Sequence, residues 1–138
     1  MELSTRRVPG VKVRPMKLLN WFQIPVTDID RAVQFYEAMM QTKLERLDDE
    51  RMKRAFFPHD PAQHERTGGE LVQGPDDRPS RDGVTIYFNS EDGVDACLAR
   101  VVAAGGTVTL PRTSIGEWGF IGLVVDSEGN GIGVHGMS

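Results

Sequence analysis

The stretch NWFQIPVTDIDRAVQFYEAMM, residues 20–40, decides the fold because it joins a strand to an amphipathic helix. Apolar and polar residues alternate along the strand, which places Trp21 and Gln23 on the face opposite its apolar side chains. Further along, apolar residues recur at helical spacing, and Thr27 or Asp28 is a suitable N-cap. The predicted buried stripe of this helix is Ile29, Ala32, Val33, Tyr36 and Met40.

The same order of elements returns in the second half of the chain. VTIYFN, residues 84–89, reads as a strand, and SEDGVDACLARVVAAGG, residues 90–106, reads as a helix closed by glycine. Three short strands follow each helix, so each half has the order βαβββ, and the whole chain reads as a tandem repeat. The predicted stripe of the second helix is Val94, Cys97, Leu98, Val101 and Val102.

These segments predict an α+β fold and a simple division of the chain. Residues 1–17 form an N-terminal arm with five basic side chains and one acidic one. Residues 18–137 form a single domain, whose two modules span about 18–73 and 84–137. The linker between the modules, residues 74–83, is rich in glycine, proline and charge, which is typical of an exposed loop.

Composition excludes several classes of partner. The 138 residues carry 16 basic and 20 acidic side chains, a net charge of −4, which favours neither nucleic acid nor an anionic membrane. No run of about 20 apolar residues suits a transmembrane helix. The single cysteine, Cys97, excludes a disulfide within the chain. Because a secretory signal is also missing, we expect a cytoplasmic protein.

Residues 20–40, together with VVDSEGNGIGVH at residues 124–135, resemble the vicinal-oxygen-chelate superfamily. That group includes glyoxalase I, extradiol dioxygenases, and bleomycin- and fosfomycin-resistance proteins. The resemblance covers about residues 18–137. It implies two tandem βαβββ modules that curl into an incomplete, cup-shaped barrel. It also implies a homodimer in which modules pair within or between chains.

The resemblance also bears on a metal site. Metal-using members of the superfamily place ligands at four inward-facing strand positions, which fall here on Trp21, Glu70, Thr85 and Gly133. Tryptophan and glycine are not ligands, and a neutral threonine hydroxyl is a poor one. The usual metal site is therefore expected to be absent, and no cofactor is predicted.

Strand alternation predicts which side chains line the concave face of the cup. Glu70 and His135 are the candidate catalytic residues, as a general-base pair or as a rearranged metal site. The alternative is that His135 bonds to the backbone and that Glu70 faces solvent or an arginine. His59 and His64 are expected in a surface loop rather than at a metal site. The candidate ligand-binding residues are Trp21, Gln23, Thr85 and Tyr87.

Three functions follow from this pattern. The first is a glyoxalase- or bleomycin-resistance-like protein that binds a small organic molecule in its cup without metal. The second is a lyase or dioxygenase-like enzyme that uses Glu70 and His135 with a weakly held divalent ion. The third is a structural or regulatory dimer whose cup is filled by its own side chains. The sequence leaves open whether the protein is an enzyme, since fold similarity alone does not establish chemistry.

Overall fold

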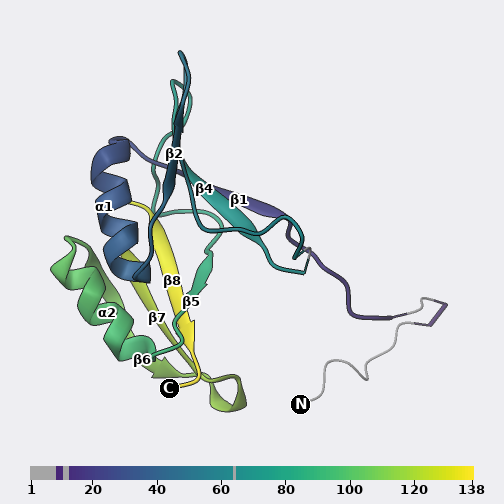
Figure 1. Cartoon of the computed structure of the whole chain (residues 1–138). Coiled ribbons are helices and arrows are strands. Elements are labelled where there is room, and N and C mark those ends of the chain that lie inside the picture. Colours follow the sequence, from purple (N-terminus) through teal and green to yellow (C-terminus); the bar gives the residue numbers. More distant parts are fainter. Residues whose placement is uncertain (1–8, 11–12, 64) are drawn as a thin grey trace.

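A computed structural model of the chain describes residues 9–10, 13–63 and 65–138. It contains two modules, each with one helix and one four-stranded sheet (Figure 1). The first module comprises β1 (Trp21–Pro25), α1 (Ile29–Met40), β2 (Glu45–Asp48), β3 (Lys53–Phe56) and β4 (Gly68–Gln73). The second comprises β5 (Tyr87–Asn89), α2 (Val94–Ala103), β6 (Thr107–Ser114), the 3₁₀ turn η2 (Gly116–Trp118), β7 (Phe120–Val125) and β8 (Gly131–Gly136). The predicted α+β class and tandem βαβββ order are confirmed.

The two sheets have the same topology. The strand order is β1-β4-β3-β2 in the first sheet and β5-β8-β7-β6 in the second. In each sheet the first strand of the module runs parallel to the last, and the other pairings are antiparallel. Neither sheet closes on itself, so the architecture is an open barrel, as the sequence predicts.

Helix α1 begins at its predicted cap and buries a wider face than predicted. The Asp28 carboxylate accepts the Arg31 N–H at 3.1 Å, and Gln41 ends the helix in the left-handed conformation. Val33 and Met40 of the predicted stripe are partly buried and pack against the core. The helix packs against both its own sheet and α2, so its buried face is Ile29, Ala32, Phe35, Tyr36 and Met39.

Helix α2 begins differently. Its N-cap is Gly93, which offers no side-chain bond, and the backbone N–H of Val94 donates to the carbonyl of Ser138 at 2.9 Å. The predicted stripe was wrong at Val102, whose side chain is 59% exposed. It lies one residue, or about 100° around the helix, beyond the buried Val101.

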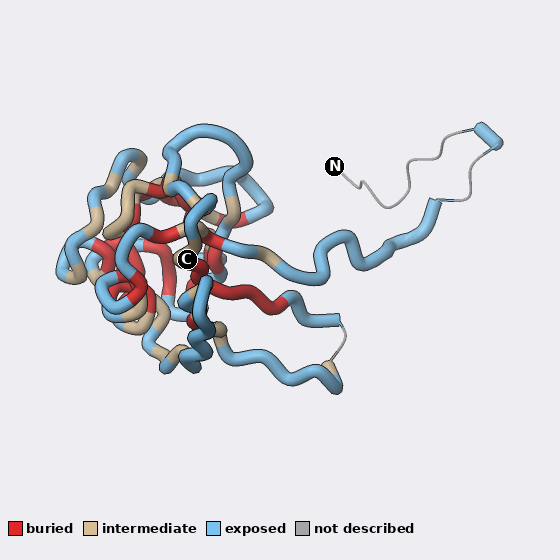
Figure 2. Tube along the Cα trace, turned by 90° about the horizontal axis from the view of Figure 1, so that it is seen from above, coloured by how far each residue is buried: buried red, intermediate tan, exposed pale blue. Residues whose placement is uncertain are grey.

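One hydrophobic core joins the two modules (Figure 2). The ring of Phe22 in β1 lies 5.8 Å from that of Phe88 in β5, edge to face. The Tyr36 hydroxyl in α1 donates to the buried carboxylate of Asp126, which follows β7, at 2.5 Å. Burial, with Asp126 beside it, raises the pKa of Tyr36 well above its usual range, so the hydroxyl stays a neutral donor. The modules therefore fold as one unit.

The segment before β1 and the linker contact different parts of the molecule. Residues 13–19 are exposed (Figure 2), and the Leu19 carbonyl accepts the Thr67 hydroxyl at 2.9 Å. The linker instead lies against the second sheet, where the Ser80 carbonyl accepts the Gly131 N–H at 3.2 Å. Within the described part of the chain, no helix combines the length and apolar character needed to cross a membrane.

Candidate functional site

Each sheet keeps one face free of helices. On β1, Ile24 points into the core, whereas Trp21 is 38% exposed on the other side. On β5, Phe88 is buried and Tyr87 is 47% exposed. Helices α1 and α2 cover only the apolar sides of their sheets. The sides that carry Trp21 and Tyr87 are called the uncovered faces below.

Glu70 is the centre of the polar cluster on the first uncovered face. Glu70 is buried, with 3% exposure, and each of its carboxylate oxygens accepts a hydrogen bond. The indole Nε1–H of Trp21 donates to Oε2 at 2.6 Å, and the Gln23 amide donates to the same oxygen at 3.4 Å. Arg54 donates to Oε1 at 2.7 Å and completes an ion pair. The carboxylate is therefore fully used by its own module.

Aromatic rings surround this cluster. The Trp21 ring lies 6.0 Å from Phe56, tilted by 54°, and 5.7 Å from His59, edge to face. A Cβ atom on Gly68, the β4 partner of Trp21, would collide with the Trp21 and His59 rings. Glycine at this position therefore lets the indole lie close against the strand.

The second uncovered face has a similar ring but no acidic residue beneath it. Tyr87 pairs with Gly133, and its ring occupies the space that a side chain there would need. His135 approaches the carbonyl of Trp118 through Nε2 at 2.7 Å. Because a carbonyl only accepts, Nε2 carries the proton in this contact. Thr85 is exposed and precedes β5.

The structure brings the predicted residues into two groups. Trp21, Gln23 and Glu70 are bonded together on the first sheet, whereas Tyr87 and His135 lie on the second. Within the described residues, no hydrogen bond or ion pair joins Glu70 to His135. A catalytic role for this pair stays a prediction.

Three hollows lie beside the predicted ligand-binding residues. Tyr87 lines a hollow of about 510 Å³, Trp21 lines one of about 360 Å³, and Gln23 lines one of about 140 Å³. The largest is bordered by Leu19 and Phe22, before and in β1, and by β5 up to Asn89. The smallest is bordered by the end of β1 and by Ile86. The largest and the smallest hollow therefore lie at the junction of the modules, whereas the hollow beside Trp21 is lined by the first module alone.

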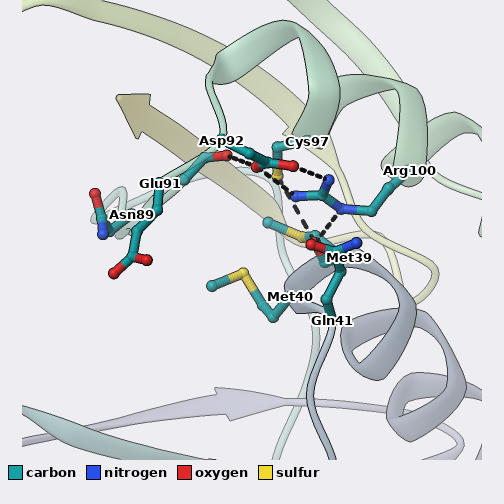
Figure 3. Close-up of a pocket in the computed structure, with 9 residues that line it drawn as sticks. Met39, Met40, Gln41, Asn89, Glu91, Asp92, Cys97 and Arg100 are labelled. Atoms are coloured by element: carbon teal, nitrogen blue, oxygen red, sulfur yellow. Dashed lines mark hydrogen bonds and ion pairs between the residues drawn. The ribbon is translucent and has the colours of Figure 1, made fainter. Parts of the chain in front are cut away.

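A further hollow of about 520 Å³ lies between the end of α1 and the start of α2 (Figure 3). Arg100 spans it, donating to the Asp92 carboxylate at 2.7 Å and to the Met39 carbonyl at 2.9 Å. The hydrogen bonds from Arg100 and then from Ser90 lower the pKa of Asp92 to about 2. Burial raises the pKa of the nearby Cys97 thiol. These contacts tie the two helices together, away from the predicted site residues.

The histidines of the sequence are dispersed. His59 lies against Trp21, and His135 lies on the other module. His64 lies outside the described residues. Among the residues that the structure describes, no group of three or more His, Cys, Asp or Glu side chains is arranged to hold a metal ion.

Sequence reasoning missed Arg54, Phe56 and His59. The first two occupy alternate positions of β3, and their contacts with Glu70 and Trp21 depend on how β3 pairs with β4. Charge alternating with aromatic residues in KRAF was the available signal, but one sequence does not reveal its partner strand. His59 was expected in a loop, where it lies, but its contact with Trp21 carried no sequence signal.

Comparisons with known proteins agree on the fold. Residues 18–134 match the family model described as Glyoxalase/Bleomycin resistance protein/Dioxygenase superfamily. A glyoxalase/bleomycin resistance protein from Albidiferax ferrireducens T118 is similar in structure, with TM-score 0.64 and 19% identity, over 86% of this chain and 97% of that one. A fosfomycin resistance protein from Listeria monocytogenes gives 0.63 and 17%, over 90% and 96%.

The chain also matches part of a larger protein. A glyoxalase I mutant from Zea mays gives TM-score 0.68 and 19% identity, over 85% of this chain but only 44% of that chain. No curated protein matches the chain in sequence. At these identities the structural likeness shows the fold alone.

Proposed function

Because the chain belongs to the Glyoxalase/Bleomycin resistance protein/Dioxygenase superfamily, we propose that it binds a small organic molecule in the hollow beside Tyr87, where the two modules meet, without a divalent metal ion. The observation that carries this proposal is the hollow of about 510 Å³ beside Tyr87. Its walls are mostly apolar, with Phe22, Phe57 and Phe88 among them. Thr42 and Asn89 supply polar groups at its edge.

This composition suits an organic ligand. Small-molecule sites are typically concave, mostly apolar and about 300–1,000 Å³ in volume, with a few polar groups that fix orientation. Hollows beside Trp21, Gln23 and Tyr87 also favour binding over a structural protein whose cup is filled by its own side chains.

The donor set does not fit a divalent metal. Glu70 is the one carboxylate among the four positions that metal-using members employ, and it is already engaged by Trp21, Gln23 and Arg54. Tryptophan at the first position and Gly133 at the last offer no ligand atom. These four positions therefore do not suit a divalent metal ion.

The exposed apolar side chains support a homodimer. Trp118 is 50% exposed and Met137 69% exposed at one end of the second module, and Leu18 is 81% exposed in the segment before β1. Apolar groups of this size commonly mark protein contacts. Sedimentation equilibrium tests this assembly, for which a mass of two chains is expected and a mass of one chain would contradict it. A cytoplasmic location stays a prediction.

The test of ligand binding is a fluorescence titration with 8-anilinonaphthalene-1-sulfonate, a small aromatic dye. We expect saturable binding to the folded protein, weakened about tenfold by Tyr87→Ala because the ring contributes contact area. Val102→Ala removes an apolar side chain that is 59% exposed on α2, outside the hollow, and serves as the matched control. Equal dye binding by the two variants, or no saturable binding at all, would overturn the proposal.

A further inference from the structure

A row of side chains crosses the first uncovered face from edge to edge. Glu45 in β2 pairs with Phe56 in β3, Phe56 pairs with Glu70 in β4, and Glu70 pairs with Gln23 in β1. Directly paired residues project to the same side of a sheet. The aromatic ring of Phe56 therefore stands between two carboxylates, and Trp21 lies beside the row.

The hollow of about 360 Å³ lies beside this row. Trp21, Phe56, Phe57 and His59 line it, together with Pro58, Glu45 and Lys43. Trp21 is tilted against Phe56 and meets His59 edge to face, so these three rings form one aromatic group. This aromatic group, together with the carboxylate-bearing Glu45, is called the cage below.

The charged residues around the cage differ in whether they form ion pairs. Arg54 already neutralises Glu70. Lys43 also lines the hollow, but its side chain is 90% exposed and its Nζ lies 3.7 Å from Glu37, which is outside the lining. Glu45 forms no ion pair within the part of the chain that the structure describes. The hydrogen bond from the Trp21 indole to buried Glu70 fixes the ring, and the nearby carboxylate makes its face more electron-rich. The cage is thus suited to positive charge.

We propose that this cage binds the alkylated ammonium group of an organic cation. Such groups are large, weakly hydrated cations that lose little by leaving water, and they are attracted to the faces of Trp, Phe and Tyr rings. A small inorganic cation would give up most of its water shell for the single carboxylate of Glu45, which also repels an anion. The inference rests on the proposed function and names the class of ligand that the first module recognises.

Choline and its uncharged isostere 3,3-dimethyl-1-butanol are the probes. The chain has two tryptophans, so Trp118→Phe leaves Trp21 as the only indole reporter. In this background we expect choline to change Trp21 fluorescence saturably. The isostere should bind about tenfold more weakly, because it fills the same space without the charge. Equal affinities, or no saturable response to choline, would overturn the cation proposal.

Variants locate the response in the cage. Phe56→Leu should weaken choline binding several-fold by removing one ring, and Glu45→Gln should weaken it by removing the carboxylate charge. Glu50→Gln, in the exposed turn after β2, is the matched control and should leave binding unchanged. Unaltered choline binding by both cage variants contradicts the proposal. Retained dye binding beside Tyr87 with no choline response defeats this inference alone, whereas loss of both responses defeats the proposed function as well.

Discussion

The two modules share a backbone plan but differ in the chemistry of their uncovered faces. At equivalent positions of the parallel pair, the first module has Gln23 opposite Glu70, whereas the second has Tyr87 opposite Gly133. Beside Gly133 the second sheet adds Leu123. The first face therefore offers charge and hydrogen bonds, and the second offers apolar contact. The repeated fold thus keeps the same register in both modules while the chemistry of its two uncovered faces differs.

The two modules also differ in the groups that bond to the first backbone N–H groups of their helices. The backbone N–H groups of Thr27 and Asp28, at the start of α1, donate to Glu128 of the other module at 3.0 and 2.8 Å. The start of α2 has the chain end, Ser138, in place of a side chain. The start of α1 therefore depends on a side chain of the other module, whereas the start of α2 is bonded by the backbone of Ser138.

Asp126→Ala should have the largest effect. Its buried carboxylate accepts the Tyr36 hydroxyl and the backbone N–H groups of Glu128 and Asn130, so its loss leaves several donors unpaired. We expect unfolding to become easier by about 3 kcal/mol in urea denaturation. Tyr36→Phe removes one of these bonds and should cost about 1 kcal/mol. Equal, small losses for both would show that the modules do not depend on this contact.

Glu70→Ala should come next, because it leaves the indole of Trp21 and the guanidinium of Arg54 without their shared acceptor. A loss of about 2 kcal/mol is expected. Gly133→Ala, at the corresponding position of the second module, should displace the Tyr87 ring and affect dye binding more than stability. Chemical denaturation measures the stability of each variant, and dye titration measures its binding. A larger loss of stability in Gly133→Ala and a larger loss of dye binding in Glu70→Ala would refute the assignment of polar and apolar faces.

Glu128→Gln should cost about 1 kcal/mol, because the side chain caps α1 and pairs with Arg31 at 2.7 Å. Burial alone would raise the pKa of Glu128, but hydrogen bonds from Arg31, the Asp28 backbone and Ser127 hold it below its usual value. Its charge therefore stabilises the fold above the ordinary glutamate pKa, and this stabilisation disappears as pH falls through the lowered pKa. The stability difference between wild type and variant should shrink on acidification, and Glu50→Gln, in the exposed turn after β2, is the control variant.

Asp92→Asn should have the smallest effect, since the ion pair with Arg100 is partly exposed. The pKa of Asp92 is lowered to about 2, so its contribution is complete above the ordinary value of 3.8 and is lost between there and pH 2. Thermal unfolding at pH 7 and pH 2 checks this. A variant that differs from wild type equally at both pH values would contradict the direction of the shift.

The sequence predicted the repeated order of elements because strand and helix periods were clear in both halves. It predicted a cap at Thr27 or Asp28, and the structure has Asp28. It misjudged Val102 because burial depends on the neighbour that a helix packs against, which no local pattern contains. The strand predicted at residues 84–89 is only three residues long in the structure, because only Tyr87–Asn89 pair with β8.

The candidate site was predicted in part. Alternation correctly placed Trp21 and Gln23 on the side of β1 that the helix does not cover. The partners of Glu70 were not predictable, because Arg54 reaches it only through the pairing of β3 with β4. Contacts that cross strands depend on register, and register is set by the whole sheet.

Metal-independent binding is the central claim, and the titration with 8-anilinonaphthalene-1-sulfonate tests it most directly. The protein is titrated after exhaustive chelation, and again after loading with Ni²⁺, Zn²⁺, Mn²⁺ or Fe²⁺. Because Glu70 is engaged by Trp21 and Arg54, the dye should bind with the same Kd in every sample. Binding that is lost on chelation and restored by one of these ions would contradict the account.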